Sequence, residues 1–171
     1  GIGLRYNGID IHQTRDYTKL SCETYIERVL QTHGWEKPTA NESDRFDAVP
    51  LPVDSVETLL KETGPSEGSK EHRELEEKVG FGYRTLLGEL MYAFVVCRLD
   101  IGFAVTLLAR FSTCPSRSHY MALKSVTRYL RRTKDWGLIY WRQAPIDLLP
   151  AVPLEHLPID DSLPSYPSHD L

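Results

Sequence analysis

Five basic side chains lie on one side of a predicted helix, where they could bind phosphate groups. The helix spans about residues 118–133, with Ser116 or Ser118 as its N-cap. At 100° per residue, the basic and apolar side chains occupy separate sectors. The basic sector contains Arg117, Lys124, Arg128, Arg131 and Arg132, and the apolar sector contains His119, Ala122, Leu123, Val126, Tyr129 and Leu130.

Such a helix can bury its apolar side in a core and hold its cations in solvent, at a pitch that can follow a phosphate backbone. The pattern therefore indicates contact with nucleic acid. An ordinary solvated basic face explains the same charge pattern equally well.

Other chemically active residue types fit catalysis or metal binding poorly. Asp160 and Asp161 lie between prolines without an apolar hairpin around them, so a solvated tail is favoured over a polymerase metal motif. The three cysteines and six histidines lack the short, regular spacing of a metal site. We predict no catalytic residue and no metal site, and we interpret His119 as a hydrogen-bonded packing residue.

The cysteines and the apolar stretches bear on the compartment. Cys22, Cys97 and Cys114 are odd in number and widely spaced, which favours a reducing environment over a disulfide framework. The apolar stretches around 86–97 and 101–108 are shorter than the roughly 20 residues that a membrane span needs. The first forty residues show no targeting leader. We expect an intracellular protein, cytoplasmic or nuclear, without membrane contact.

Charge is distributed unevenly along the 171 residues, whose net charge is -4. Residues 80–142 contain ten basic and three acidic groups, a net charge of +7. Residues 41–79 contain five basic and eleven acidic groups, and residues 143–171 contain no basic and five acidic groups. A basic, hydrophobic segment between acidic flanks indicates a polyanion as a partner.

Hydrophobic periodicity predicts an α+β fold that is mostly α. The predicted elements are a hairpin in 1–22, helices over 24–34, 71–78, 83–97, 101–111 and 118–133, and a strand over 138–141. The helix over 101–111 is apolar almost all round, so we expect its neighbours to enclose it. Prolines predict a loop over 38–68, and an extended or disordered tail over 143–171.

Residues 83–92 and 98–105 resemble copia-type retrotransposon reverse transcriptase. The family's pattern there is Y-R-x-x-x-G-x-L-M-Y, followed by T-R-P-D-I-x-F-A-V. Further matches follow the family's order: residues 6–11 with Y-L-G-I-E-I, 25–35 with K-Y-I-x-x-L-L-x-x-F-G-M, 128–133 with the R-x-L-R-Y-L-K-G-T block, and 136–140 with the strand after it. The resemblance covers roughly residues 3–37 and 80–142.

The resemblance implies a fragment of an RNA-directed DNA polymerase with four parts. These are the end of the palm (1–37), an acidic linker (38–79), a thumb-like bundle of three to four helices with a following strand (80–142), and a Pro-rich acidic tail toward RNase H (143–171). The fragment would grip an RNA or DNA template-primer duplex without sequence preference. Phosphates would bind Arg117, Lys124, Arg128, Arg131 and Arg132, and the primer end would lie near Tyr6, Asn7 and Gly8.

The chain departs from the family at several positions. Cys97 stands where the family has Thr, and Leu99 where it has Pro. The Y-V-D-D hairpin and the earlier Asp, whose carboxylates hold two Mg²⁺ ions in the family, are missing. We therefore expect no cofactor and no polymerase activity in this chain by itself. Two alternatives remain: a free-standing helical nucleic-acid-binding module, or an inert, degenerate relic of a retroelement.

Overall fold

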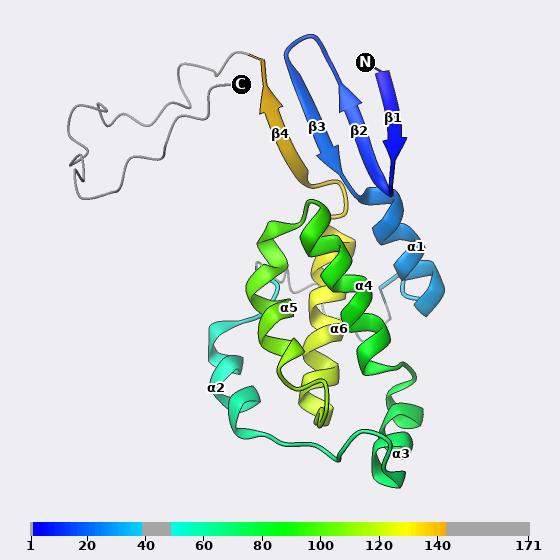
Figure 1. Ribbon diagram of the computed structural model, residues 1–171, viewed down its shortest axis with the longest axis vertical. Coiled ribbons are helices and arrows are strands. Elements are labelled where there is room, and N and C mark those ends of the chain that lie inside the picture. The colour runs from blue at the N-terminus through cyan, green and yellow to red at the C-terminus, as the bar shows by residue number, and fades with distance from the viewer. Residues whose placement is uncertain (1, 39–48, 143–171) are drawn as a thin grey trace, which may run out of the picture.

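The computed structural model describes residues 2–38 and 49–142, with a four-stranded antiparallel sheet at one end of a group of helices (Figure 1). This confirms the predicted α+β, mostly helical fold. The acidic tail over 143–171 lies outside the described residues. In the part of the chain that is described, every helix is too short or too polar to cross a membrane.

The sheet joins both ends of the described chain. Its strands, in spatial order, are β1 (Ile2–Tyr6), β2 (Ile9–Gln13), β3 (Tyr17–Ser21) and β4 (Gly137–Trp141). Asn7 and Gly8 connect β1 to β2 with φ angles of 48° and 78°, as a tight two-residue hairpin requires. The predicted hairpin is thus part of a larger sheet, because β4 pairs with β3.

The predicted helices of the core are present with nearly the expected bounds. They are α1 (Glu23–His33), α4 (Tyr83–Val96), a 3₁₀ turn η1 (Leu99–Ile101), α5 (Gly102–Ala109) and α6 (Arg117–Arg132). Gly34 ends α1 in the left-handed conformation, at φ 67°. Helices α4, α5 and α6 pack together, and their central side chains Leu86, Leu90, Val105, Leu108, Leu123 and Val126 are almost completely buried.

A helix occupies part of the segment for which a loop was predicted. Helix α2 (Val53–Lys61) lies within 38–68, and α3 (Lys70–Val79) contains the predicted charged helix. The loop prediction is wrong there because tertiary contacts hold α2: Leu59 is 3% exposed, and His119 Nε2 lies 2.9 Å from the Leu59 carbonyl oxygen. Residues 39–48 lie outside the described residues.

The helix predicted to be enclosed on all sides is open on one of them. In α5, Ala104, Val105 and Leu108 are buried, but Phe103 is 63% exposed. Leu99, just before this helix, is 61% exposed. An apolar composition reports which side chains avoid water, and it does not report whether the folded chain supplies enough neighbours to cover them.

Candidate nucleic-acid interface

Helix α6 begins with two reciprocal hydrogen bonds. Ser116 Oγ accepts from the His119 N–H (3.4 Å), and His119 Nδ1 accepts from the Ser116 N–H (2.9 Å). Because Nδ1 is an acceptor, Nε2 carries the proton and donates to the Leu59 carbonyl. His119 is fully buried. It is therefore a hydrogen-bonded packing residue, as predicted.

The cations of α6 are less exposed than the helical wheel predicts. Arg117 is exposed, whereas Lys124, Arg128, Arg131 and Arg132 are partly buried. Arg131 Nη1 donates to the carbonyl oxygens of Trp35 (3.1 Å) and Lys37 (3.4 Å), which follow α1. Instead of projecting as a ladder into solvent, this part of α6 lies against the segment after α1. The expectation of five cations held in solvent is wrong in this respect.

Two cations from elsewhere in the sequence join those of α6. Lys37 lines a small hollow with Lys124, Arg128 and Arg131, and Lys78 lines a hollow of about 460 Å³ with Arg117 and Lys124. We call these six residues, Lys37, Lys78, Arg117, Lys124, Arg128 and Arg131, the basic cluster. Arg132 does not line either hollow. Sequence reasoning missed Lys37 and Lys78 because they reach α6 only through the packing of α1 and α3.

An aromatic ring lies inside the basic cluster. The Lys124 ammonium lies 5.1 Å from the centre of the Trp35 ring, within the range of a cation–π contact. His33 stacks on the same indole, with 4.7 Å between ring centres. His33 Nε2 in turn lies 2.7 Å from Glu89 Oε2 on α4. Trp35 thus fixes the position of Lys124 relative to α1 and α4.

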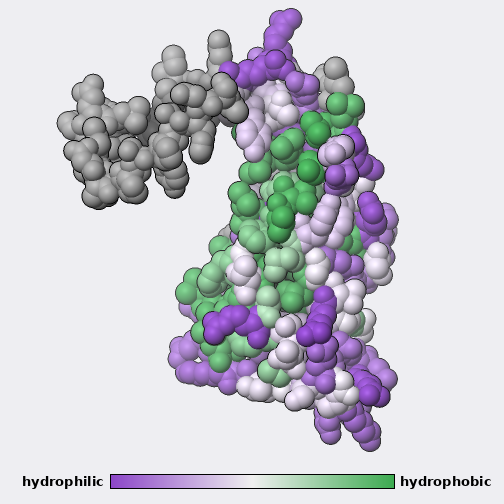
Figure 2. Space-filling view, in the orientation of Figure 1, coloured by the Kyte–Doolittle hydropathy of each residue, from purple (hydrophilic) through white to green (hydrophobic). Residues whose placement is uncertain are grey.

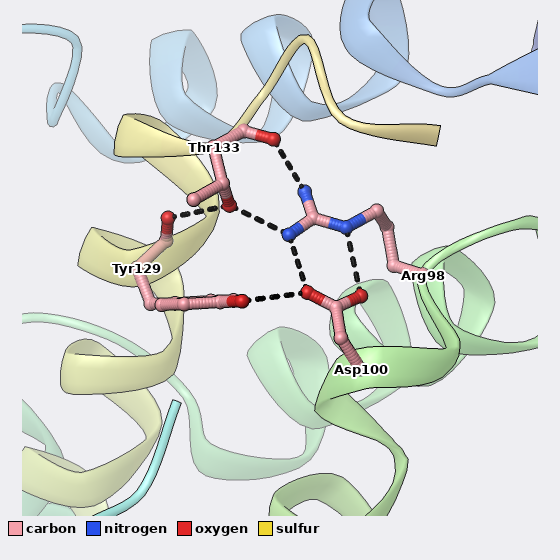
Figure 3. A network of polar contacts seen from close by, with 4 residues as sticks. All are labelled: Arg98, Asp100, Tyr129 and Thr133. Atoms are coloured by element: carbon pink, nitrogen blue, oxygen red, sulfur yellow. Dashed lines mark hydrogen bonds and ion pairs between the residues drawn. The ribbon is translucent and has the colours of Figure 1, made fainter. Parts of the chain in front are cut away.

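A buried polar network holds the other end of α6 (Figure 3). Arg98 is 1% exposed, and it donates to the Thr133 carbonyl (2.9 Å) and to Thr133 Oγ1 (2.6 Å). Its other guanidinium contacts are with both carboxylate oxygens of Asp100, at 3.0 and 2.7 Å. The Tyr129 hydroxyl donates to Asp100 (2.9 Å). The network joins the segment between α4 and α5 to the C-terminal turn of α6.

This network shifts the ionisation of its acidic members. Burial opposes the charge on Asp100, but the hydrogen bonds from Arg98 and Tyr129 outweigh it, and the pKa of Asp100 lies below its usual value. Burial and the hydrogen bond to Asp100 raise the pKa of Tyr129. At neutral pH, Asp100 is therefore charged and balances the buried Arg98.

The hairpin turn predicted to lie near a primer end contacts α4 instead of the basic cluster. The Tyr92 hydroxyl donates to the Asn7 carbonyl at 2.5 Å. A Cβ atom on Gly8 would lie 2.9 Å from the same hydroxyl, and Gly8 has a φ of 78°, so a larger residue would displace the Tyr92 side chain and strain the turn. Tyr6 is 67% exposed. Tyr92 packs against Tyr25 near the start of α1, with 4.6 Å between ring centres, whereas Trp35 follows the end of α1. The turn and the cluster therefore lie at opposite ends of this helix.

The remaining candidate residues do not gather into a site. Within residues 2–38 and 49–142, no three His, Cys, Asp or Glu side chains lie together as metal ligands would. Asp160 and Asp161 lie outside the described residues. Trp136 and Trp141 are 51% and 44% exposed and lie edge-on to Tyr129 and Tyr17.

Comparison with known proteins relates the chain to mobile genetic elements. The Retrovirus-related Pol polyprotein from transposon TNT 1-94 of Nicotiana tabacum is 33% identical over 144 residues, which are 81% of this chain and 10% of that polyprotein. The Putative transposon Ty5-1 protein of Saccharomyces cerevisiae is 27% identical over 138 residues, 80% of this chain and 39% of that protein. The homologues are retrotransposon Pol polyproteins.

A different kind of protein shares a shorter segment. Secreted RxLR effector protein 161 of Plasmopara viticola is 39% identical over 67 residues, which are 39% of this chain and 47% of that protein. The chain thus spans about half the length of the effector and about a tenth of the tobacco polyprotein. No protein-family model and no solved structure matches the chain. The comparisons support a retrotransposon-derived protein.

Proposed function

We propose that this chain derives from the part of a copia-type reverse transcriptase that grips the template-primer, and that the basic cluster binds nucleic-acid phosphates without reading sequence. The observation that carries the proposal is the convergence of Lys37 and Lys78 on the cations of α6. Cations from three separate segments that meet on one surface produce a stronger local field than a solvated helix face. The similarity to retrotransposon Pol polyproteins supports the same interpretation.

Three residues of the cluster differ in the part that they play in this function. Arg117 is exposed, and Lys124 lies over Trp35 between the two hollows, so these two can reach phosphates without rearrangement of the core. Arg131 already donates to two backbone carbonyls, and it supports the surface by joining α6 to the end of α1. A Mg²⁺-dependent nucleotidyl transfer is not part of the proposal.

The experiment is a salt titration of binding to a short duplex of random sequence. For a surface that binds by displacing counterions, the logarithm of the affinity falls linearly with the logarithm of salt concentration, with a slope of about 0.9 per phosphate on B-DNA. Replacing Arg117 and Lys124 by Ala together should reduce that slope by about two and weaken binding to all sequences alike.

The control is a double variant that removes two exposed cations outside the cluster, Lys61→Ala with Arg84→Ala. Their side chains are 73% and 56% exposed, on α2 and α4. This variant has the same net charge as Arg117→Ala with Lys124→Ala, so it should leave the slope near that of the wild type. Equal losses in both double variants would contradict a localised interface. Discrimination among competing sequences would favour a base-reading module.

A further inference from the structure

An uncharged ridge runs along the outer side of α4 and α5. Its exposed members are spaced three or four residues apart within α4, and again from Leu99 into α5, so they lie on one face of each helix. The members are Gly88, Tyr92, Val95, Leu99, Phe103 and Thr106, which we call the α4–α5 ridge. Val95 is 70% exposed, Phe103 63% and Leu99 61%.

The ridge is not needed to hold the two helices together. Phe94 fills the seam between them, because a Cβ atom on Gly102 would lie 2.6 Å from the Phe94 ring. Ala93, Ala104 and Val105 already face the core and are 0–2% exposed. The side chains on the ridge therefore leave apolar surface in water that packing within the described residues does not cover.

The apolar surface continues from the ridge onto the sheet. Figure 2 shows hydrophobic side chains gathered in a band that runs from the strands down over α4 and α5. Tyr92 contacts the β1–β2 turn, and in β1 Leu4 and Tyr6 are 60% and 67% exposed. Together with Tyr92, Val95, Leu99 and Phe103, they expose on the order of 700 Å² of mostly apolar surface, close to what one partner contributes to a stable interface.

We propose that this face binds a second copy of the same chain, so that the protein is a two-fold symmetric dimer. In such a dimer the same patch meets itself, and like charges on the patch would repel. The ridge avoids this cost, since its own members are uncharged and the carboxylates next to it in sequence are paired. Glu89 contacts His33, and Asp100 is held by Arg98 and Tyr129. The exposed area of this face is close to what one subunit of a dimer buries. Because the members of the ridge carry no charge, they would not attract a charged partner.

Sedimentation velocity of the full chain over a range of concentrations up to about 100 µM tests the proposal. We expect a monomer of 19.6 kDa in equilibrium with a species of twice that mass. Replacing Val95 and Phe103 by Glu together should raise the dissociation constant at least about 30-fold, because buried like charges would face each other at the centre of the contact. Circular dichroism should show unchanged helix content, since both side chains are exposed.

The matched control is Val53→Glu on α2, where an apolar side chain is 81% exposed outside the ridge. It should leave the dimer intact. If Val95→Glu with Phe103→Glu lowers the helix content, Leu99→Gln serves as a milder variant with the same expected direction. A wild type that stays monomeric at about 100 µM overturns the proposal, and so does a double Glu variant that dimerises as the wild type does.

Discussion

Arg98 has the largest side chain that is almost completely buried in the described part of the protein. A guanidinium removed from water is tolerated only when carboxylate and carbonyl groups replace its hydration. Asp100, two residues away, supplies the opposite charge, and Thr133 supplies two oxygen acceptors from the end of α6. Loss of the Asp100 carboxylate would therefore leave the buried Arg98 charge without an opposite charge.

Replacing Asp100 by Asn should destabilise the protein by about 1–2 kcal/mol at pH 7. This is less than the loss from a fully buried ion pair, because the Asp100 side chain is 33% exposed while Arg98 is buried. The pKa of Asp100 is lowered in the folded state, so its stabilising effect is present above the unfolded pKa of about 3.9 and is lost as pH falls through the lower folded pKa. Urea unfolding at pH 7 and near pH 3 measures the difference, which should shrink at the acidic pH.

The comparison variant is Asp135→Asn, which removes a carboxylate at an exposed position. It should change the free energy of unfolding by less than about 0.5 kcal/mol at either pH. A loss at Asp100 that equals the loss at Asp135 would show that the network does not stabilise the fold.

The thiols should differ sharply in reactivity. A hydrogen bond joins Cys22, which precedes α1, to Cys97, which follows α4; it lowers the pKa of Cys97 and raises that of Cys22. A lower pKa makes a thiol more reactive, but only where a reagent can reach the sulfur. Cys22 and Cys97 are 0% and 3% exposed, so a reagent cannot reach either of them in the folded protein. Only the partly buried Cys114 should react quickly with a disulfide reagent in the native protein, and Cys114→Ser should abolish that phase. Rapid labelling of two thiols would contradict the burial.

At the scale of the helices, α2 and the chain after it are held by contacts distant in sequence. Glu62, just after α2, accepts hydrogen bonds from the hydroxyls of Ser116 (2.6 Å) and Ser118 (3.1 Å) at the start of α6. The next contact is backbone to backbone, from the Gly64 N–H to the Cys114 carbonyl at 2.9 Å. These bonds fasten α2 and the chain after it across the N-terminus of α6.

Replacing Glu62 by Gln should loosen this attachment while leaving the core folded. The hydrogen bonds from Ser116 and Ser118 lower the pKa of Glu62, so the attachment is present above the ordinary Glu value and weakens as pH falls below about 4. Limited trypsin digestion at neutral pH should cut after Lys61 faster in Glu62→Gln than in the wild type. The control is Glu57→Gln, on an exposed side of α2. It removes the ion pair with Lys61 but not the attachment to α6, so it should accelerate the cut less than Glu62→Gln does.

The helices that periodicity predicted are those whose own residues form a buried side. In α4 and α6, side chains such as Leu90 and Leu123 recur at helical spacing and are buried, so the local pattern sufficed. Helix α2 was missed because only one of its residues is buried. That residue, Leu59, is covered by α6, which is distant in sequence. For the candidate site, the pattern of α6 predicted its cations, but Lys78 joined them only through the folded chain. The exposure of Phe103 could not be predicted, since residue type does not reveal which apolar face stays uncovered.

At the scale of the whole molecule, β4 makes the sheet and the helices one unit. The chain leaves α6 at Arg132 and returns to the sheet at Gly137, whose partner in register is Ser21 on β3. A Cβ atom on Gly137 would lie 2.1 Å from the Leu20 carbonyl oxygen, which belongs to the backbone and cannot move aside. The junction between the two ends of the described chain therefore requires glycine.

Replacing Gly137 by Ala should lower the melting temperature by about 5 °C or more, since overpacking against backbone costs about 1–3 kcal/mol and each kcal/mol corresponds to about 2–4 °C at this size. Gly88→Ala makes the same chemical change at an exposed position of α4, where the new Cβ atom would have no neighbour within 4 Å. It should raise the melting temperature by about 2 °C, because alanine favours a helix interior over glycine by about 1 kcal/mol. Calorimetry of the two variants measures both shifts. Opposite signs are expected because the added methyl group meets the Leu20 backbone at position 137 and no atom within 4 Å at position 88. Shifts of the same sign would contradict the close contact between β3 and β4.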